Sequence, residues 1–371
     1  MNIKEVIENK LEQVRELRKV LHQQAELSFQ EFETQKILMD FFQDLKIPVK
    51  KVTNTGLVAT LNSGESCIAL RADMDALPVN GVSHACGHDY HMAIAAGTAL
   101  VLKELDYKGC VKFIFQPGEE TTGGALPMIQ EGVLENPPVE KILGFHVWPG
   151  VKVGTIEAAA GPSMASDDDF TFTFLGKGGH GAMPHLCKHP LYPAMDFIQT
   201  MNEKSRMDFD PLESHVMTFA SLQAGSASNV IPDECVVRGT VRTFSSTLRN
   251  AIHQTMLATA DSCAKKYGCT VVSTYNLQYP PLINDSALTH RFIEEAKKLM
   301  GEENVLPLVK TFAAEDFAYF AQEVPAVHFR LGIEDGVKGK LPLHASGFDA
   351  SEDAIYYGIA ILTNFILSLE N

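Results

Sequence analysis

The sequence has little of what marks a secreted, membrane-bound or nucleic-acid-binding protein. Its seven cysteines are an odd number without a CxxC pair, a pattern that fits free thiols in a reducing compartment such as the cytoplasm rather than a disulfide framework. Basic residues are scarce: 31 Lys and Arg against 46 Asp and Glu leave a net charge of -15. This balance argues against docking on duplex nucleic acid or on anionic lipid.

Long apolar runs are also missing. The N-terminus lacks the apolar core of a signal peptide. The uncharged stretch 354–369 is shorter than the ~20 residues that span a bilayer, and it contains Tyr356 and Tyr357. We therefore expect it to be a buried helix and expect no membrane partner.

The length of 371 residues predicts two domains, because domains usually contain ~100–200 residues. In the first part of the chain, short apolar runs typical of strands alternate with helical patterns. Strands are expected at 57–61, 67–71, 111–115 and 141–145, and helices at 92–105 and 125–131. This alternation predicts an α/β domain with a largely parallel sheet, whose site lies where strands end.

The middle of the chain follows another order. Strands are expected at 170–175, 215–222, 234–243 and 270–275, and helices at 190–204 and 246–267. The order β-α-β-β-α-β is that of a ferredoxin-like unit, which is self-sufficient and could be an inserted domain. Helices at 286–300 and 350–369, with a strand at 326–331 between them, follow the insert.

A short motif, His84-Ala85-Cys86-Gly87-His88-Asp89, carries the first chemical signal. Thiolate and imidazole both bind zinc-like ions, and a turn containing glycine lets Cys86 and His88 face one point. The motif alone is weak, since a buried thiol beside a surface histidine would give the same letters. Its surroundings favour a site, because Asp73, Asp75 and His91 lie close by in the sequence.

Further candidates stand where strands are expected to end. Glu119 and Glu120 follow a strand, and adjacent carboxylates repel unless a cation or proton neutralises one of them. One could bind a metal while the other takes a proton from water, although two solvated loop acids are an equal alternative. His146 also stands at a strand end, where a lone histidine is more often structural, and His344 taken alone indicates almost nothing.

The expected insert contributes three polar candidates. His180 lies on the glycine loop Gly176-Lys177-Gly178-Gly179-His180-Gly181, which matches neither phosphate-binding pattern and suits a group that swings toward a substrate. Asn229 precedes Val230-Ile231-Pro232, and Arg242 is suited to a bidentate grip on a carboxylate. Taken alone, Arg242 reads as a surface strand arginine.

Together these pieces resemble the aminoacylase/carboxypeptidase family of dinuclear metallopeptidases, and within it the amidohydrolase branch. That branch includes aminoacylases, hippurate hydrolases, auxin-conjugate hydrolases and N-acetyl-diaminopimelate deacetylases. The resemblance covers nearly the whole chain and rests on the segments 21–22, 26–29, 71–78, 84–91, 118–120, 145–146, 178–180, 229–232, 239–242, 314–317 and 343–344.

The resemblance implies a zinc-peptidase-like α/β catalytic domain (1–167 and 278–371) with an inserted ferredoxin-like lid and dimerisation domain (168–277). It implies two divalent ions, Zn, Mn, Co or Ni, and a homodimer formed through the lid. It also implies roles for individual residues. By this resemblance, the metal ligands are Cys86, His88, Glu120, His146 and His344, and Glu119 is the general base. In the same way, His180 stabilises the oxyanion, and Asn229 and Arg242 bind the substrate carboxylate.

The function expected from this resemblance is hydrolysis of N-acyl, above all N-acetyl, amino acids to a free amino acid and a carboxylic acid. A carboxypeptidase or dipeptidase using the same site is an alternative, because the chemistry is equally feasible there. A third interpretation of the sequence is a non-catalytic relative that only binds a metal or a ligand. The presence of both Glu119 and Glu120 disfavours this interpretation.

Overall fold

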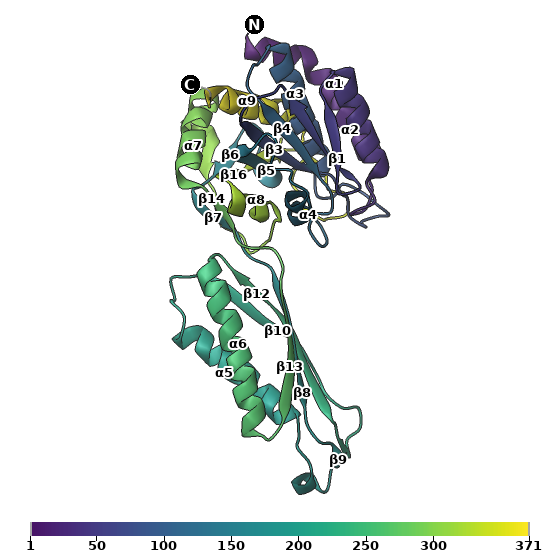
Figure 1. The fold of residues 1–371 in the computed structure, drawn as a ribbon, viewed down its shortest axis with the longest axis vertical. Coiled ribbons are helices and arrows are strands. Elements are labelled where there is room, and N and C mark those ends of the chain that lie inside the picture. Colours follow the sequence, from purple (N-terminus) through teal and green to yellow (C-terminus); the bar gives the residue numbers. More distant parts are fainter. Residues whose placement is uncertain (1, 370–371) are drawn as a thin grey trace. The chain divides into compact units, whose positions relative to one another are not determined.

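The computed structural model describes residues 2–369, which form two compact units (Figure 1). Of the described residues, unit 1 takes 2–163, 283–309 and 316–369, and unit 2 takes Met164–Leu282 and Lys310–Glu315. The second unit is therefore inserted within the sequence of the first. No helix among residues 2–369 combines the length and the hydropathy that a membrane span requires.

Unit 1 is built on an eight-stranded mixed sheet in the order β1-β2-β4-β3-β5-β16-β6-β15. Its strands are β1 (Val49–Val52), β2 (Gly56–Leu61), β3 (Cys67–Asp73), β4 (Val111–Gln116), β5 (Val139–Lys152), β6 (Ile156–Ala158), β15 (Val305–Pro307) and β16 (Ala326–Glu334). The four central strands β4, β3, β5 and β16 are parallel, whereas β1, β2 and the β16–β6 pair are antiparallel. The predicted α/β class is confirmed, and the parallel part is its centre.

Helices cover both faces of this sheet. The larger core lies under α1 (Ile3–Gln23), α2 (Phe32–Asp44), α3 (His88–Glu104), α7 (Ser286–Met300) and α9 (Asp353–Ser368). The other face carries α4 (Ala125–Gln130) and α8 (Phe317–Glu323), which contact each other. A short 3-10 turn, η2 (Glu302–Asn304), follows α7 in the chain. Phe317 lies on the face opposite that core, because a Cβ on Gly144 would meet its ring at 2.7 Å while the neighbours Leu143 and Phe145 point into the core.

Helix α3 is buried on all sides along residues 88–102, as expected for a helix in the middle of a layer. It lies against α1 and α9 (Figure 1). Two glycines allow the close approach of α3 and α9: a Cβ on Gly97 would stand 2.6 Å from Ile359, and a Cβ on Gly358 would stand 2.7 Å from Ile94. The helix begins at His88, four residues before the predicted start at residue 92, so that the motif histidine opens the helix.

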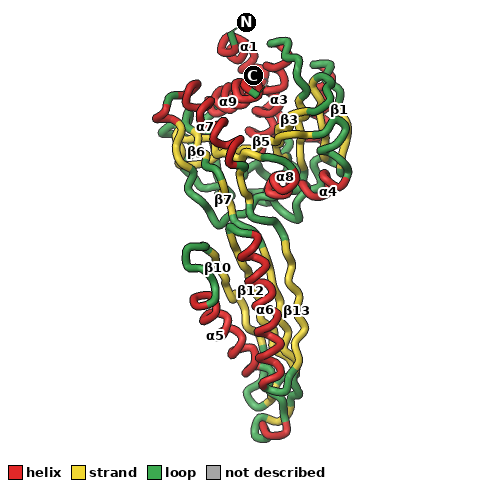
Figure 2. Tube along the Cα trace, turned by 60° about the vertical axis from the view of Figure 1, so that its left-hand side comes forward, coloured by secondary structure: helices red, strands yellow, loops and turns green. Residues whose placement is uncertain are grey.

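Unit 2 contains an antiparallel four-stranded sheet in the order β10-β12-β8-β13. Its strands are β8 (Asp168–Leu175), β10 (His215–Gln223), β12 (Glu234–Thr243) and β13 (Thr270–Leu277), and its helices are α5 (Leu191–Met207) and α6 (Ser246–Lys266). Both helices pack on one face of the sheet (Figure 2). The core between helices and sheet contains Phe172, Phe197, Ile252 and their neighbours. Ser245 caps α6 by accepting the Leu248 N–H at 3.2 Å.

The remaining elements are short. A two-stranded ribbon pairs β9 (Gly179–His180) with β11 (Val230–Ile231), and a 3-10 turn, η1 (Pro184–Leu186), follows β9 in the chain. A second ribbon joins β7 (Gly161–Met164) to β14 (Leu282–Asn284). The order of the longer elements in unit 2 is the predicted β-α-β-β-α-β.

Candidate metal centre

The polar residues of unit 1 gather where its parallel strands end and α3 begins. Asp73 is the last residue of β3, Gln116 is the last residue of β4, and His88 is the first residue of α3. His146 comes from β5, and His344 from the loop between β16 and α9. Carboxyl ends of parallel strands are the usual place for a site in such sheets.

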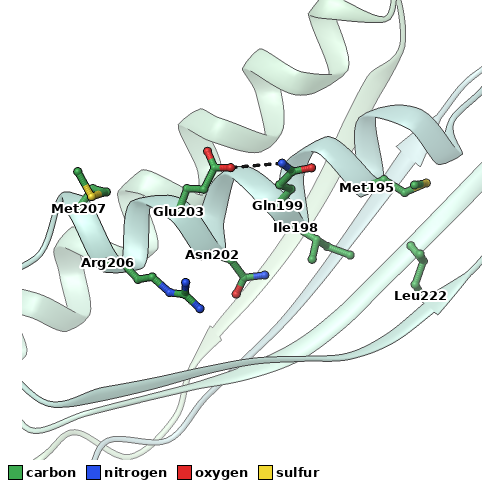
Figure 3. A pocket seen from close by; sticks show the side chains of 8 residues that line it. All are labelled: Met195, Ile198, Gln199, Asn202, Glu203, Arg206, Met207 and Leu222. Carbon is green, nitrogen blue, oxygen red and sulfur yellow. Dashed lines mark hydrogen bonds between the residues drawn. The ribbon is translucent and has the colours of Figure 1, made fainter.

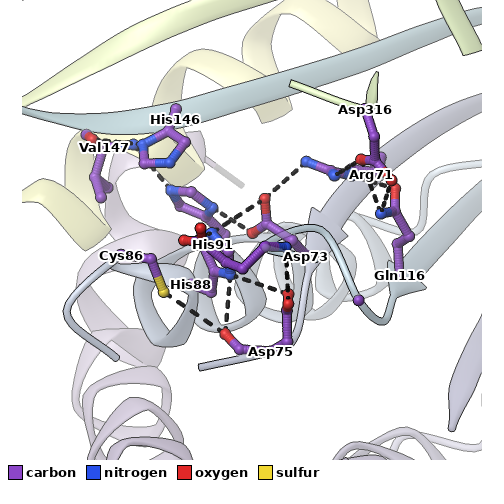
Figure 4. A network of polar contacts seen from close by, with 12 residues as sticks. Arg71, Asp73, Asp75, Cys86, His88, His91, Gln116, His146, Val147 and Asp316 are labelled. Carbon is purple, nitrogen blue, oxygen red and sulfur yellow. Dashed lines mark hydrogen bonds and ion pairs between the residues drawn. The ribbon is translucent and has the colours of Figure 1, made fainter. Parts of the chain in front are cut away.

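The turn that bears Cys86 and His88 depends on Gly87. Its φ is +87°, and a Cβ there would stand 2.3 Å from Cγ2 of Val147. Glycine is the residue that adopts this conformation without strain and leaves room for β5 to approach. Cys86 and His88 are consequently both buried and lie side by side (Figure 4).

His88 is oriented by Asp75. Its Nδ1–H donates to the Asp75 carbonyl at 2.9 Å, so that the neutral ring, the form that binds a metal, carries its lone pair on Nε2. Nε2 is buried, has no hydrogen-bond partner among the described residues, and lies 3.6 Å from Asp73 Oδ2 and 4.0 Å from Glu120 Oε1. A buried nitrogen lone pair facing carboxylates suits a cation.

Glu120 and His344 complete this side of the centre. Glu120 Oε1 lies 3.1 Å from Nε2 of His344, and this hydrogen bond raises the pKa of His344. His344 has a φ of +66°, and its backbone N–H donates to the Ala85 carbonyl at 2.8 Å. That bond ties the loop of His344 to the motif of Cys86.

The donor set has the chemistry of a divalent-metal site. Ligand atoms of Cys86, His88 and Glu120 lie within 4.8 Å of one another and offer sulfur, nitrogen and oxygen. Burial raises the pKa of the Cys86 thiol to about 11, and a bound cation would reverse this by stabilising the thiolate. Although burial opposes it, Asp73 and Cys86 raise the pKa of His88 well above its usual value, so the cluster favours a positive charge.

His146 lies beside the same cluster. Its ring centroid is 4.6 Å from that of His91 and 5.8 Å from that of His88. Nδ1–H donates to the Val147 carbonyl at 2.7 Å, so Nε2 carries the lone pair. Burial, helped by His91, lowers the pKa of His146 well below its usual value and keeps it neutral, the form that binds metals.

A second group of possible ligands, Asp73 with His88 and His91, is a hydrogen-bond network. His91 Nδ1–H donates to Asp73 Oδ1 at 2.5 Å, and the Val147 N–H donates to His91 Nε2 at 2.9 Å. Both His91 nitrogens are therefore occupied. Burial alone would raise the pKa of Asp73, but His88, His91 and Arg71 hold it well below its usual value.

Arg71 connects this network to the far end of the chain. It donates to Asp73 at 2.7 Å, to Asp316 at 2.7 Å and to Gln116 at 2.8 Å, and all four side chains are buried (Figure 4). Asp316 also accepts the Ala125 N–H at 3.0 Å. The sequence alone predicted no role for Arg71 or Asp316. The alternation of Arg71 and Asp73, which puts both on one side of β3, was the available signal.

The structure brings six of the nine predicted site residues into unit 1. Five are the expected ligands described above, and the sixth is Glu119, which is buried next to Glu120. The other three lie in unit 2. His180 on β9 is exposed and pairs with Val230 of β11, and the Gly181 N–H donates to the Asn229 carbonyl at 2.8 Å, so His180 and Asn229 are neighbours.

Arg242 lies on β12 and already has an anionic partner. Its Nη2 is 2.9 Å from Asp167 Oδ1, and both side chains are about one-quarter exposed, at 25% and 20%. A guanidinium held in this way remains accessible to a second carboxylate.

Comparisons with known proteins give one consistent family. A profile described as peptidase family M20/M25/M40 matches residues 69–368. The chain is 34% identical over 357 residues to the N-acetyl-L-cysteine deacetylase of Bacillus subtilis, covering 91% of this chain and 84% of that protein. It is 32% identical over 384 residues to thermostable carboxypeptidase 2 of Saccharolobus solfataricus, covering 96% of each.

A solved structure agrees with this result. The crystal structure of a dinuclear metal-binding peptidase of the M20 family from Bacillus subtilis superposes with a TM-score of 0.84 at 30% identity, covering 98% of this chain and 99% of that one.

Proposed function

The chain belongs to the peptidase family M20/M25/M40, and from that premise we propose that it hydrolyses the amide bond of N-acyl amino acids. The observation that carries this proposal is the buried cluster of Cys86, His88 and Glu120 with Glu119 next to it. The deacetylase relative supports an acetyl group as the acyl part. The products are a free amino acid and a carboxylic acid.

The proposed cofactor is a pair of divalent ions, Zn, Mn, Co or Ni, held by Cys86, His88, Glu120, His146 and His344. The mixed sulfur, nitrogen and oxygen donors fit such ions, as does the lone pair on Nε2 of His88. When bound, they would polarise the scissile carbonyl and make water more acidic. The M20 relative described as dinuclear supports the number of ions.

Glu119 is the proposed general base. It accepts a proton from the attacking water as the new C–O bond forms, and it then donates that proton to the leaving nitrogen as the C–N bond breaks. The two neighbouring carboxylates have different proposed roles: Glu120 binds a cation, and Glu119 transfers a proton. Arg71 and Asp73 hold their surroundings in place by fixing His91 and the end of β3.

Three residues of unit 2 are proposed to bind the substrate. Asn229 and Arg242 bind the carboxylate of the substrate, and His180 stabilises the oxyanion that forms at the scissile carbonyl. The exposure of His180 and the partial exposure of Arg242 are consistent with groups that meet a ligand.

A homodimer formed through unit 2 is proposed as well. β10 is an edge strand of the sheet, and beside it α5 carries an apolar hollow of about 630 Å³ (Figure 3). The exposed side chains Met195, Met207 and Leu222 line it. An unpaired edge with apolar neighbours suits a second copy of this strand and helix.

The seven free cysteines, six of them buried, favour a reducing compartment such as the cytoplasm.

A carboxypeptidase acting through the same centre is the second candidate, and the carboxypeptidase relative favours it. Amino acids with different N-acyl groups, tested beside unblocked dipeptides with metal-loaded protein, separate the two by which compounds release an amine. In the same assay Glu119→Gln should keep its metal and lose turnover by about 10²–10⁴-fold, the usual contribution of a general base. Wild-type turnover in that variant would remove Glu119 from the mechanism.

A further inference from the structure

The loop that carries Glu119 and Glu120 is held by two hydrogen bonds of its backbone. The loop follows β4 and belongs to no helix or strand. The Gly118 N–H donates to Glu31 Oε1 at 3.0 Å, and the Glu120 N–H donates to Asp75 Oδ2 at 3.0 Å. The two bonds stand on either side of Glu119, and charged acceptors make them stronger than bonds between neutral groups.

Both bonds lead back to residues 28–31, between α1 and α2. Glu31 belongs to this segment, and Ser28 donates to the same Asp75 oxygen at 2.6 Å. Glu31 is fully buried, and its second oxygen accepts the Thr55 hydroxyl at 2.7 Å. Buried carboxylates that find donors for their oxygens are fixed in position.

Phe29 adds a third contact between the segment and the loop. A Cβ on Gly118 would stand 2.4 Å from Cζ of Phe29, so the phenyl ring lies directly on the Gly118 backbone. Phe29 has a φ of +61°, which is unusual for an aromatic residue. Such conformations persist where the surroundings hold them, and they gather at functional sites.

The segment is itself anchored to the chain that follows β3. Leu27 forms an isolated bridge with Ala76, and the Ala76 N–H donates to the Glu26 carbonyl at 2.8 Å. Glu26 in turn accepts the N–H and the hydroxyl of Thr34, both at 2.9 Å. Residues 28–31 are thus fastened at both ends before they meet the Glu119 loop.

We propose that Ser28, Phe29 and Glu31 are positioning residues that fix Glu119 and Glu120 for the reaction. The inference rests on the proposed function of those two glutamates. None of the three touches the reacting atoms. They act by limiting where the loop backbone can go, and a misplacement of about 1 Å in a catalytic group can reduce turnover by about 10²-fold.

The kinetic test uses the full chain loaded with metal. Ser28→Ala should lower kcat by about 10–100-fold and leave KM within about twofold, because the loss is one of catalytic geometry. Ser28→Thr keeps the hydroxyl and should restore most of the rate. Gln30→Ala is the matched control, since Gln30 is exposed in the same segment. Wild-type kcat in both Ser28→Ala and Glu31→Gln would overturn the proposal.

A second readout does not depend on activity. In metal-free protein, amide hydrogen exchange at Gly118 and Glu120 should accelerate by about tenfold or more in Ser28→Ala and Glu31→Gln, but not in Gln30→Ala. Lost kcat with unchanged exchange at both amides would also overturn the proposal, because the effect would not pass through the loop. If the wild type turns over no N-acyl amino acid while the exchange still accelerates, the proposed function fails and the bracing of the loop stands.

Discussion

Gly87 offers the sharpest test of the metal centre's architecture. It separates Cys86 from His88, has a φ of +87°, and faces Val147, whose Cγ2 would stand 2.3 Å from an added Cβ. Val147 is fully buried on β5, next to His146, so it has no open space to move into. Replacing Gly87 by alanine should therefore disturb both the fold and the centre.

The expected loss has two parts. A non-glycine residue in the left-handed region costs about 1–2 kcal/mol. Forcing an extra methyl into a packed core costs about 1–3 kcal/mol more. Together they predict that Gly87→Ala lowers the free energy of unfolding by about 2–5 kcal/mol, and because Val147 adjoins His146, metal affinity should fall too.

Gly81→Ala is the control for this experiment. Gly81 has a φ of +94°, but an added Cβ would meet no atom within 4 Å. Its loss of about 1–2 kcal/mol should thus report backbone strain alone. Urea denaturation of metal-free protein measures both variants, and in a double-mutant cycle Val147→Ala should relieve part of the Gly87→Ala loss. Equal losses in the Gly87 and Gly81 variants would refute the steric part of the reasoning.

Three further predictions concern stability and assembly. Arg71→Leu leaves the buried carboxylates of Asp73 and Asp316 without their cation, so urea denaturation should show a loss of about 3–5 kcal/mol; a smaller loss would mean that these carboxylates take up protons instead. Burial lowers the pKa of His328 to about 3, so the unfolded chain takes up this proton first as the pH falls below about 6.5. Stability should therefore decrease from pH 6.5 toward pH 3, and His328→Asn should make the slope shallower by up to about 1.4 kcal/mol per pH unit, which an unchanged slope would contradict. Met195→Asp puts a charge in the hollow of unit 2, so sedimentation should show monomers where the wild type forms dimers; a wild type that is itself monomeric would remove the proposed dimer.

The sequence predicts the regular elements of both units well, because apolar periodicity is a local property. The helix at 286–300 and the strand at 234–243 have their predicted bounds, and most other predicted elements differ by a few residues. The short strands β6 and β15 and the seven-residue helix α8 were not predicted, since each is too brief to show a period. The early start of α3 also escaped prediction because it depends on the left-handed conformation of Gly87.

The candidate site was predictable only in part. Local chemistry pointed to Cys86, His88, Glu119 and Glu120, but the pairing of Glu120 with His344 across the chain came from the family resemblance. The structure places the two within hydrogen-bonding distance, and their role as ligands stays a prediction. Contacts such as that of Arg71 with Asp316, 245 residues apart, have no local signature, because they exist only once the sheet has formed.

The place of β16 in the sheet has a consequence for synthesis on the ribosome. β16 lies between β5 and β6, yet its residues 326–334 follow the whole of unit 2 in the chain. While the chain emerges, β5 must wait with one edge unpaired, whereas unit 2 already holds almost all of its residues and can close its own core. The inserted unit is therefore expected to fold first during translation, although its residues follow the first part of unit 1 in the chain. His344 is the last of the candidate ligands to be synthesised.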